Sequence, residues 1–410
     1  MKDNDKQRCV IVGASHAGSQ AALRLRKLGW AGKITIVGDE PHLPYHRPPL
    51  SKEYLKGAKK ADAIHLDAEA NYQANDIDLR LGTRGEVIDR ENRRLRLDGG
   101  KSLPYSHLVL AVGSQPRKLP LPGASLDGVH YLRNIDDVDR IRSGVREGRR
   151  AVVIGGGYIG LEVAASLRML GMEVTVLEAL PRVLQRVTCE KVSEFFTRVH
   201  REESVEIRTD TMVSAVLGKG KVCGVELANG EIIETNLVVV GIGILPNTSL
   251  AEAAGLDVDN GIAVDEHART SDPAVYAIGD CTSFHHPRYG CKVRLESVQN
   301  ANDQAIVAAQ AIAGTPAPYD TVPWFWSDQF DVKLQIVGLA QGAHEQVVRS
   351  DPAAGRKMSV LYLKDRKLLA VDALNRPQDF VFGKKLILEN AQLDIAKLAD
   401  PNVALKDARA

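Results

Sequence analysis

The sequence predicts an α/β protein with two copies of a strand–turn–helix–strand unit and a C-terminal α+β domain. Apolar runs alternate with helical stretches through most of the chain, as in folds built on parallel sheets. Glycine-rich turns join strand to helix at two places. From residue 323 onward the pattern changes to a series of strands followed by helices. The length of 410 residues suits two or three domains.

The first unit has an apolar strand that enters a turn containing Gly13, Ser15 and Gly18. A helix follows, and then a strand over residues 33–37. This is the G-x-G-x-x-G arrangement of dinucleotide-binding units, with Ser15 in place of the middle glycine. A small residue at that position still permits a close approach of the backbone to a pyrophosphate. Of the two acids after the second strand, Glu40 is the first choice for binding a ribose hydroxyl, because of its place past the strand end.

The next segment, residues 41–52, reads PHLPYHRPPLSK and is too rich in proline for a helix or a central strand. The prolines make a stiff loop that presents Arg47, Ser51 and Lys52 at a fixed place. Lys52 is either a group beside a cofactor or a solvated surface lysine. The two histidines of the loop have no further His or Cys cluster nearby, so no metal site is predicted.

Residues 77–98 alternate strand patterns with turn residues, which indicates a small antiparallel meander. A buried strand is expected over residues 104–114, which include Ala111. The proline-rich stretch 115–123 then marks a domain boundary. A helix with an acidic start and a basic end is expected within residues 129–148.

The second unit, residues 151–178, carries the most complete motif of the chain. Three glycines fit G-x-G-x-x-G between an apolar strand and a helix whose N-terminus faces the phosphates. Glu178 follows at about the 20 residues expected of a carboxylate that binds a ribose 2′-hydroxyl. A later strand ends in small residues at 241–243, which lets a second backbone segment approach the same nucleotide. The residues assigned to this nucleotide are Gly155, Gly157, Tyr158, Ile159, Gly160, Glu178 and Gly243.

Two further features lie toward the C-terminus. Asp280 ends a strand over residues 274–280, and open α/β sheets bind ligands at the carboxyl ends of their strands. The stretch 323–328, PWFWSD, gathers two tryptophans and a phenylalanine. It forms either a core aromatic cluster or a surface where a tryptophan faces a cofactor. The strands and helices that follow carry no nucleotide signal.

The composition excludes several classes of protein. A net charge of +1 argues against a nucleic-acid-binding protein driven by bulk charge. Apolar runs stay well below the ~20 residues of a membrane span, and the N-terminus lacks a signal-type apolar core. The five cysteines are scattered and form no C-x-x-C, which is typical of a cytoplasmic protein without disulfides. Two Rossmann-type units in one chain usually bring two dinucleotides together for hydride exchange.

As a set, GASHAG, GDEPHLPYHRPPLSK, LAVGSQPR, GGGYIGLE, VVGIGILPN, VYAIGD and PWFWSDQF resemble the FAD-dependent, NADH-using ferredoxin reductases of bacterial oxygenase systems. This family includes putidaredoxin reductase and the reductases of biphenyl-type dioxygenases. The resemblance covers nearly the whole chain and implies a glutathione-reductase-like fold. It implies an FAD domain from residues 1–118 and 248–322, an NADH domain over 119–247 and a C-terminal domain over 323–410.

The resemblance also implies roles for single residues. The first glycine turn and Glu40 would hold the ADP half of FAD, which leaves the second turn for NADH. Glu162 would pair with Lys52 near the flavin N5 and the nicotinamide, as the catalytic pair. Glu178 would repel a 2′-phosphate, so NADH is expected over NADPH. The residues implied to bind FAD are Gly13, Ser15, Gly18, Glu40, Arg47, Lys52, Ala111, Asp280 and Trp326.

We predict that the protein passes electrons from NADH through FAD, one at a time, to an acidic [2Fe–2S] ferredoxin. This ferredoxin would serve a P450 or Rieske-type oxygenase. A disulfide-reductase-like flavoenzyme or NADH oxidase would need a redox-active cysteine near the flavin, and none lies between Cys9 and Cys189. A rubredoxin reductase and a redox-sensing flavoprotein stay as alternatives. The basic residues Arg288, Lys292 and Arg294 form either a docking surface or a solvated loop. The chain is expected to be a monomer or weak dimer.

Overall fold

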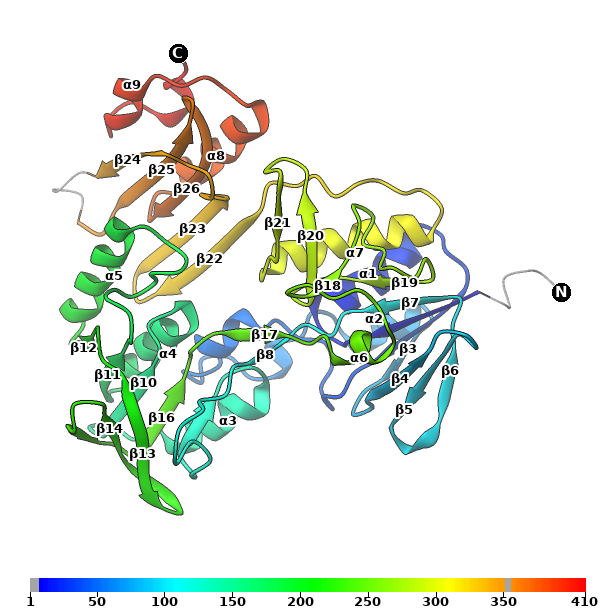
Figure 1. The fold of residues 1–410 in the computed structure, drawn as a ribbon, viewed down its shortest axis with the longest axis horizontal. Helices are drawn as coiled ribbons and strands as arrows, with labels where there is room; N and C mark the ends of the chain where they lie inside the picture. The colour runs from blue at the N-terminus through cyan, green and yellow to red at the C-terminus, as the bar shows by residue number, and fades with distance from the viewer. Residues whose placement is uncertain (1–6, 351–354) are drawn as a thin grey trace. The chain divides into compact units, whose positions relative to one another are not determined.

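The structure is a computed structural model that describes residues 7–350 and 355–410. The chain forms two compact units, and each unit combines segments that are distant in the sequence. Unit 1 contains the described residues up to 46, residues 62–115 and residues 245–323. Unit 2 contains residues 47–61, 116–244, 324–350 and 355–410. Figure 1 shows both units, coloured along the chain.

Unit 1 is built on a parallel sheet with the strand order β19-β7-β1-β2-β3. Its strands are β1 (Arg8–Val12), β2 (Lys33–Val37), β3 (Ile77–Arg80), β7 (His107–Leu110) and β19 (Val275–Ala277). Branched apolar residues dominate these strands because both faces of a parallel sheet are covered. The sheet therefore ends in a row of carboxyl termini, where the first glycine turn and Asp280 follow their strands.

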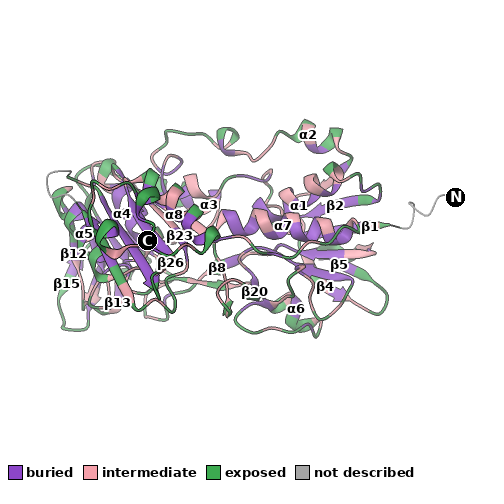
Figure 2. Cartoon of the chain, turned by 90° about the horizontal axis from the view of Figure 1, so that it is seen from above, coloured by how far each residue is buried: buried purple, intermediate pink, exposed green. Residues whose placement is uncertain are grey.

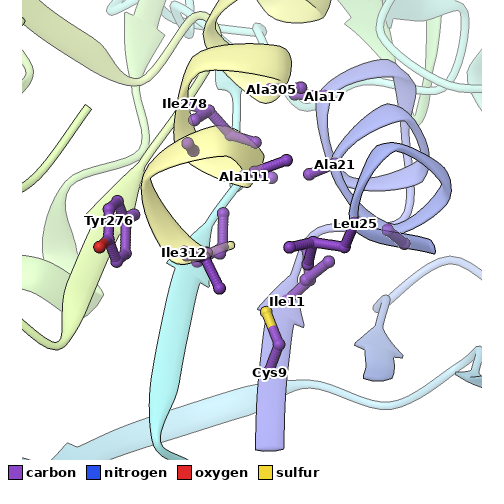
Figure 3. Packing of buried hydrophobic residues seen from close by; sticks show 14 of the residues in the cluster. Cys9, Ile11, Ala17, Ala21, Leu25, Ala111, Tyr276, Ile278, Ala305 and Ile312 are labelled. Carbon is purple, nitrogen blue, oxygen red and sulfur yellow. The ribbon is translucent and has the colours of Figure 1, made fainter. Parts of the chain in front are cut away.

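Helices α1 (His16–Lys27) and α7 (Val298–Ile312) cover one face of this sheet. Figure 3 shows Ile11 of β1 beneath Ala21 and Leu25 of α1, with Ala305 of α7 beside Ala17. All five side chains are buried. Alanines at the contact allow the two helices to lie close together, which fixes the start of α1 over the end of β1.

The rest of unit 1 consists of short elements. An antiparallel sheet joins β4 (Gly85–Asp89), β5 (Arg94–Leu97) and β6 (Ser102–Pro104), and a second small sheet joins β18 (Ile262–Ala263), β20 (Thr282–His286) and β21 (Cys291–Val293). The short helices are η3 (Asp62–Ile64), α2 (Glu69–Ala74), η4 (Asp98–Gly100) and α6 (Ser249–Ala253).

The expected meander over residues 77–98 is wrong for its first strand. β3 pairs in parallel with β2, where Ile77 lies opposite Ile34, instead of pairing with β4. The reason is that Ile77 is buried in the core beneath α1, so β3 completes the main sheet. The later strands β4 and β5 do pair antiparallel, as expected.

Unit 2 repeats the parallel architecture with the order β12-β11-β10-β16-β9. The strands are β9 (Val129–Tyr131), β10 (Arg150–Ile154), β11 (Glu173–Leu177), β12 (Val205–Arg208) and β16 (Leu237–Val240), and the helices are α3 (Ile135–Gly144), α4 (Tyr158–Met169) and α5 (Glu190–Glu202). Asn134 and Asp137 form a capping box at the start of α3. Helix α4 is buried along most of its length, whereas α5 is amphipathic and buries one face.

A small antiparallel sheet of β13 (Val213–Lys219), β14 (Lys221–Leu227) and β15 (Ile232–Glu234) adjoins these strands in the sequence. The expected hairpin at Asn229-Gly230 connects β14 to β15, and Gly230 has the positive φ of 85° that such turns require. Two short strands, β8 (Ser114–Pro116) and β17 (Ile244–Pro246), lie where the chain passes between units.

The C-terminal part of unit 2 is an antiparallel sheet with the order β22-β23-β26-β25-β24. Its strands are β22 (Trp324–Gln329), β23 (Val332–Gly338), β24 (Glu345–Ser350), β25 (Met358–Lys364) and β26 (Lys367–Leu374), followed by α8 (Pro377–Glu389), α9 (Ile395–Ala399) and η6 (Leu405–Asp407). Figure 2 shows that β23 and β26 are largely buried. The buried Arg349 ties α9 to this sheet by donating to the Leu398 carbonyl at 2.5 Å. Within the described ranges, no helix is long and apolar enough to span a bilayer.

Candidate functional site

The glycine turn of unit 2 is closed to side chains at two of its three motif positions. Gly155 has a φ of 109°, and a Cβ there would lie 2.4 Å from the Gly241 carbonyl oxygen. A Cβ on Gly160 would lie 2.1 Å from the Gly155 carbonyl oxygen. Only glycine allows this close packing of strand, turn and helix. Gly157 differs, because a Cβ there would meet no described atom within 4 Å.

The turn of unit 1 likewise has no room for a Cβ at its first and third motif glycines. Gly13 has a φ of 120°, and its Cβ would lie 2.1 Å from the Ala111 carbonyl oxygen, while that of Gly18 would lie 1.9 Å from the Gly13 carbonyl oxygen. Ser15 is the N-cap of α1 at a φ of −133°, an extended conformation that any residue adopts. Serine at the middle position therefore causes no backbone strain, and Ala111 contributes through its backbone.

Both turns fit the pyrophosphate of a dinucleotide. Neither α1 nor α4 has an acidic residue in its first turn, and neither N-cap side chain bonds to the helix. The first N–H groups of each helix, with the positive end of its dipole, suit a phosphate. Tyr158 and Ile159 begin α4: Tyr158 is half-buried, with its hydroxyl buried and its ring 4.8 Å from that of Phe325, and Ile159 is 44% exposed.

The two candidate ribose acids have different surroundings. The Glu178 carboxylate accepts hydrogen bonds from the backbone N–H of Gly156 at 2.7 Å and of Leu180 at 2.9 Å, so it is fixed beside its glycine turn. A carboxylate has about four acceptor positions, so both oxygens keep capacity for a ribose hydroxyl. Glu40 instead accepts from the Tyr45 hydroxyl at 2.5 Å.

Lys52 and Glu162 form a buried ion pair inside unit 2. The Lys52 ammonium lies 2.6 Å from Glu162 Oε2, and these residues are 8% and 3% exposed. Lys52 comes from the proline-rich loop, whose 3₁₀ helix η2 (Pro48–Ser51) holds the chain in place. Glu162 projects from α4, two residues after Gly160. The alternative of a solvated surface lysine is wrong, because the stiff loop packs Lys52 against α4.

The Glu162 carboxylate accepts three donors in all. The Ser51 hydroxyl donates to Oε2 at 2.5 Å, and the Ser327 hydroxyl of β22 donates to Oε1 at 2.6 Å. Beyond Ser327, Gln329 and His200 continue the series of hydrogen bonds. Charge-assisted bonds from three sides compensate the burial of this carboxylate.

No sequence pattern predicted a role for Ser327, Gln329 or His200. Ser327 lies inside the PWFWSDQF stretch, in which only the aromatic residues indicated a function. His200 is 129 positions from Gln329, so no local pattern connects them. A polar residue alternating with aromatics on a strand is a signal that could have drawn attention to Ser327.

The remaining predicted residues are fixed by local contacts. Arg47 donates to the Arg133 carbonyl at 2.7 Å within unit 2. Asp280, one position past Gly279 at the end of its strand, accepts from the Ser114 hydroxyl at 3.1 Å within unit 1. The Trp326 ring lies 5.5 Å from that of Trp324 on β22. Gly243 follows β16 with a φ of 107°, which favours glycine.

Two of the five cysteines are unsuited to redox catalysis. None of the five forms a disulfide, and Cys9 and Cys281 are completely buried. Burial raises the pKa of both thiols to about 12, so neither forms a thiolate near neutral pH. Within the described residues there is also no group of three His, Cys, Asp or Glu side chains able to hold a metal.

The basic cluster in unit 1 is neutralised by neighbouring acids. Arg288 lies 3.4 Å from Asp320. Lys292 and Arg294 pair with Asp259 and Glu296, respectively. This arrangement favours an ordinary solvated loop over a surface that attracts an acidic partner.

Comparisons with known proteins agree with this geometry. Residues 7–305 match the family described as pyridine nucleotide-disulphide oxidoreductase, and residues 324–409 match the family described as reductase C-terminal. The chain is 45% identical to a 5,5′-dehydrodivanillate O-demethylase ferredoxin reductase subunit of a Sphingobium strain, covering 98% of each chain. It is 42% identical to putidaredoxin reductase CamA of Pseudomonas putida, covering 98% of this chain and 97% of that protein.

Solved structures of ferredoxin reductases are also similar to this chain. A covalent putidaredoxin reductase–putidaredoxin complex superposes with a TM-score of 0.95 at 42% identity and 98% coverage of both chains. A ferredoxin reductase of Rhodopseudomonas palustris superposes with a TM-score of 0.94 at 43% identity, covering 98% of this chain and 100% of that one. The fold is therefore glutathione-reductase-like, and the cofactors of this family are FAD and NAD(P)H. The chain belongs to the pyridine nucleotide-disulphide oxidoreductase family, with a reductase C-terminal domain at its end.

Proposed function

We propose that this protein passes electrons from NADH through FAD, one at a time, to a [2Fe–2S] ferredoxin of an oxygenase system. The buried Lys52–Glu162 ion pair, at 2.6 Å beside the second glycine turn, is the observation that carries the proposal. It supplies a fixed charge arrangement for hydride transfer in a chain whose two buried thiols, Cys9 and Cys281, do not ionise near neutral pH. The relatives named above are ferredoxin reductases, and this supports the same acceptor class.

Electron counting explains why the chain needs two nucleotide turns. NADH gives up two electrons as a hydride, whereas a [2Fe–2S] ferredoxin takes one electron at a time. When bound, FAD would supply the chemistry that joins a two-electron donor to a one-electron acceptor. The protein binds both cofactors, orients their reactive ends and keeps water from the site. No general acid or base is required of the side chains.

We assign the residues accordingly. The turn of unit 1, with Glu40, binds the ADP half of FAD, and the turn of unit 2 binds NADH. Lys52 and Glu162 are assigned as the charged pair near the flavin N5 and the nicotinamide. Arg47, Ala111, Asp280 and Trp326 complete the FAD assignment.

Glu178 is assigned to the choice of NADH over NADPH. Its carboxylate is fixed by two backbone N–H groups beside the turn, so a 2′-phosphate would meet a negative charge that cannot move away. A ribose 2′-hydroxyl would instead donate to it. The assignment follows from charge and hydrogen-bond chemistry alone.

The proposed partner is an acidic ferredoxin, and the protein works in the cytoplasm as a monomer or weak dimer. Because acids already pair with the basic cluster, reversing the charge of Arg288 with Arg288→Glu should leave ferredoxin reduction within about twofold. Ferricyanide reduction in the same variant is the control for intact NADH oxidation. A large loss with ferredoxin alone would restore that cluster as the docking surface.

Steady-state NADH oxidation tests the function. A [2Fe–2S] ferredoxin should accelerate NADH oxidation well above the rate with oxygen alone. A rubredoxin at the same concentration tests the alternative acceptor. If neither carrier accelerated the reaction over oxygen, the proposed function would be rejected in favour of an oxidase or a redox-sensing flavoprotein.

A further inference from the structure

A buried series of hydrogen bonds leads from α5 to the catalytic pair inside unit 2. His200 Nε2 lies 2.9 Å from Gln329 Oε1, and Gln329 Nε2 lies 3.2 Å from Ser327 Oγ. Ser327 Oγ in turn lies 2.6 Å from Glu162 Oε1. All four residues are at most 3% exposed. Three separate elements, α5, β22 and α4, therefore contribute to one polar network.

The series has a single direction. Glu162 only accepts from Ser327, so the serine hydroxyl donates and its oxygen is left to accept from the Gln329 amide N–H. The amide oxygen of Gln329 then faces His200 and needs a donor, which fixes the proton of the imidazole on Nε2. Each bond in the series thus points toward the Glu162 carboxylate, an arrangement in which neighbouring hydrogen bonds strengthen one another.

The other nitrogen of the ring keeps His200 neutral. Nδ1 is buried and has no hydrogen-bond partner in the described part of the chain, so a second proton there would have no acceptor. Burial lowers the pKa of His200 to about 4, with Arg356 acting in the same direction and with Gln329 and Glu203 opposing it. The donor on Nε2 is therefore constant across the working pH range.

We propose that His200 is a positioning residue for the Lys52–Glu162 pair, acting through Gln329 and Ser327. Its Nε2–H fixes the orientation of the Gln329 amide, and this amide directs the Ser327 hydroxyl to Glu162 Oε1. Oε2 is then left to Lys52 and Ser51. The inference rests on the proposed function, because it gives the pair its role in hydride transfer.

Substitutions at residue 200 separate donation from packing. The His200 ring lies 5.1 Å from that of Phe330 in an edge-on arrangement, so His200→Phe keeps an aromatic contact and removes only the donor. His200→Gln places an amide N–H near the position of Nε2 and should restore the effect. Phe196→Leu is the matched control, because Phe196 is also completely buried on α5 and has no polar group.

The primary readout is selective ¹⁵N NMR of the FAD-loaded protein. His200 should show the Nε2–H tautomer, and the Lys52 ammonium resonance, assigned by its loss in Lys52→Met, should shift in His200→Phe. It should stay in place in Phe196→Leu and return toward the original position in His200→Gln. With ferricyanide as acceptor, kcat of His200→Phe should fall about tenfold with KM for NADH nearly unchanged. Adding Ser327→Ala to His200→Phe should cost no more than Ser327→Ala alone.

The proposal would be overturned by an Nδ1–H tautomer for His200 or by an unchanged Lys52 resonance in His200→Phe. A loss of activity shared equally by Phe196→Leu would likewise show a purely structural role. These outcomes are independent of the final acceptor. A wild-type protein that reduces ferricyanide but no ferredoxin would reject the proposed function and leave the positioning role of His200 intact.

Discussion

The two glycine turns share their backbone conformation and hydrogen bonds. They differ in the position of the carboxylate that is predicted to bind a ribose hydroxyl. The first motif glycine donates to the neighbouring strand in both, from Gly13 to the Val37 carbonyl at 2.7 Å and from Gly155 to the Leu177 carbonyl at 2.8 Å. The third glycine packs against the first in both turns. The middle position is extended in each, whether it holds serine or glycine. The backbone therefore explains binding of a dinucleotide but not the choice between two of them.

The two turns differ in where their carboxylates, Glu40 and Glu178, lie along the chain. Gly38 donates to the Arg80 carbonyl at 3.0 Å and accepts from Thr83 at 2.8 Å. Glu178 makes the equivalent bonds to Arg208 at 2.9 Å and from Thr211 at 2.9 Å. The structural counterpart of Glu178 is thus Gly38, and Glu40 lies two positions further along. Each turn therefore has its carboxylate at a different position along the chain.

The first residue of the helix after each turn differs as well. His16 of α1 lies 3.3 Å from a ring nitrogen of His46. Tyr158 of α4 is half-buried with its hydroxyl buried, and burial together with the charges of Asp372 and Glu162 raises the pKa of this hydroxyl. The helix after each turn therefore begins with a residue in different surroundings.

The largest effect is expected at the first glycine of the second turn. Gly155→Val combines a φ of 109° with a Cβ only 2.4 Å from the Gly241 carbonyl oxygen. It should destabilise unit 2 by about 5 kcal/mol and abolish NADH oxidation, since strain and a backbone clash add. Gly230→Ala, at a φ of 85° without described neighbours within 4 Å, should cost only about 1 kcal/mol. Urea unfolding of both variants is the measurement, and equal losses would contradict the role of the close contact.

Asp372 of β26 should make the free energy of unfolding depend on pH. Burial raises its pKa to about 7, against the opposing hydrogen bond from Tyr362 at 2.6 Å. The unfolded chain releases this proton near pH 4 and the folded chain near pH 7, so stability falls as pH rises through this window, by up to about 4 kcal/mol. Asp372→Asn should remove this decline. Unfolding free energies at pH 5 and 8 test it, and parallel pH profiles for the two proteins would refute it.

Glu178→Gln should lower kcat/KM for NADH about tenfold and bring NADPH closer to it, because a charged acceptor and a repulsive charge are both lost. The FAD content should stay the same. The matched variant Glu40→Gln should weaken FAD retention and leave the ratio of NADH to NADPH unchanged. If Glu40→Gln altered the nucleotide preference, the assignment of the two turns would have to be exchanged.

The smallest effect is expected for Ser15→Gly, which makes the first turn resemble the second. Ser15 is extended at a φ of −133°, and its side chain does not cap α1. Removing it should change the free energy of FAD binding by only a few tenths of a kcal/mol. Fluorescence titration of the apoprotein with FAD measures this. A change above about tenfold would mean that the serine hydroxyl itself binds the cofactor.

Local patterns accounted for most elements and for the glycine turns. The turns are continuous in the sequence, and their spacing follows from the geometry of a strand, a tight turn and a helix. The partner of β3 was mistaken because a short alternating strand looks the same at the edge of a parallel sheet and in a meander.

The polar network behind Glu162 could not be predicted for a different reason. His200, Ser327 and Glu162 come from three elements, and only the packing of α4, α5 and β22 brings them together. The Lys52–Glu162 contact was expected only through a family resemblance, and the structure contains it. The cofactor roles of the assigned residues stay predictions until the variants above are measured.

Electron stoichiometry is the most direct test of the account. The FAD-loaded protein is mixed without oxygen with NADH and an excess of oxidised [2Fe–2S] ferredoxin, and both absorbance changes are followed together. Two ferredoxins should be reduced for each NADH oxidised, because NADH carries two electrons and each ferredoxin accepts one. The rate of ferredoxin reduction should depend on the NADH concentration, and this reduction should be lost in Glu162→Gln. Oxidation of NADH without reduction of the ferredoxin would contradict the account.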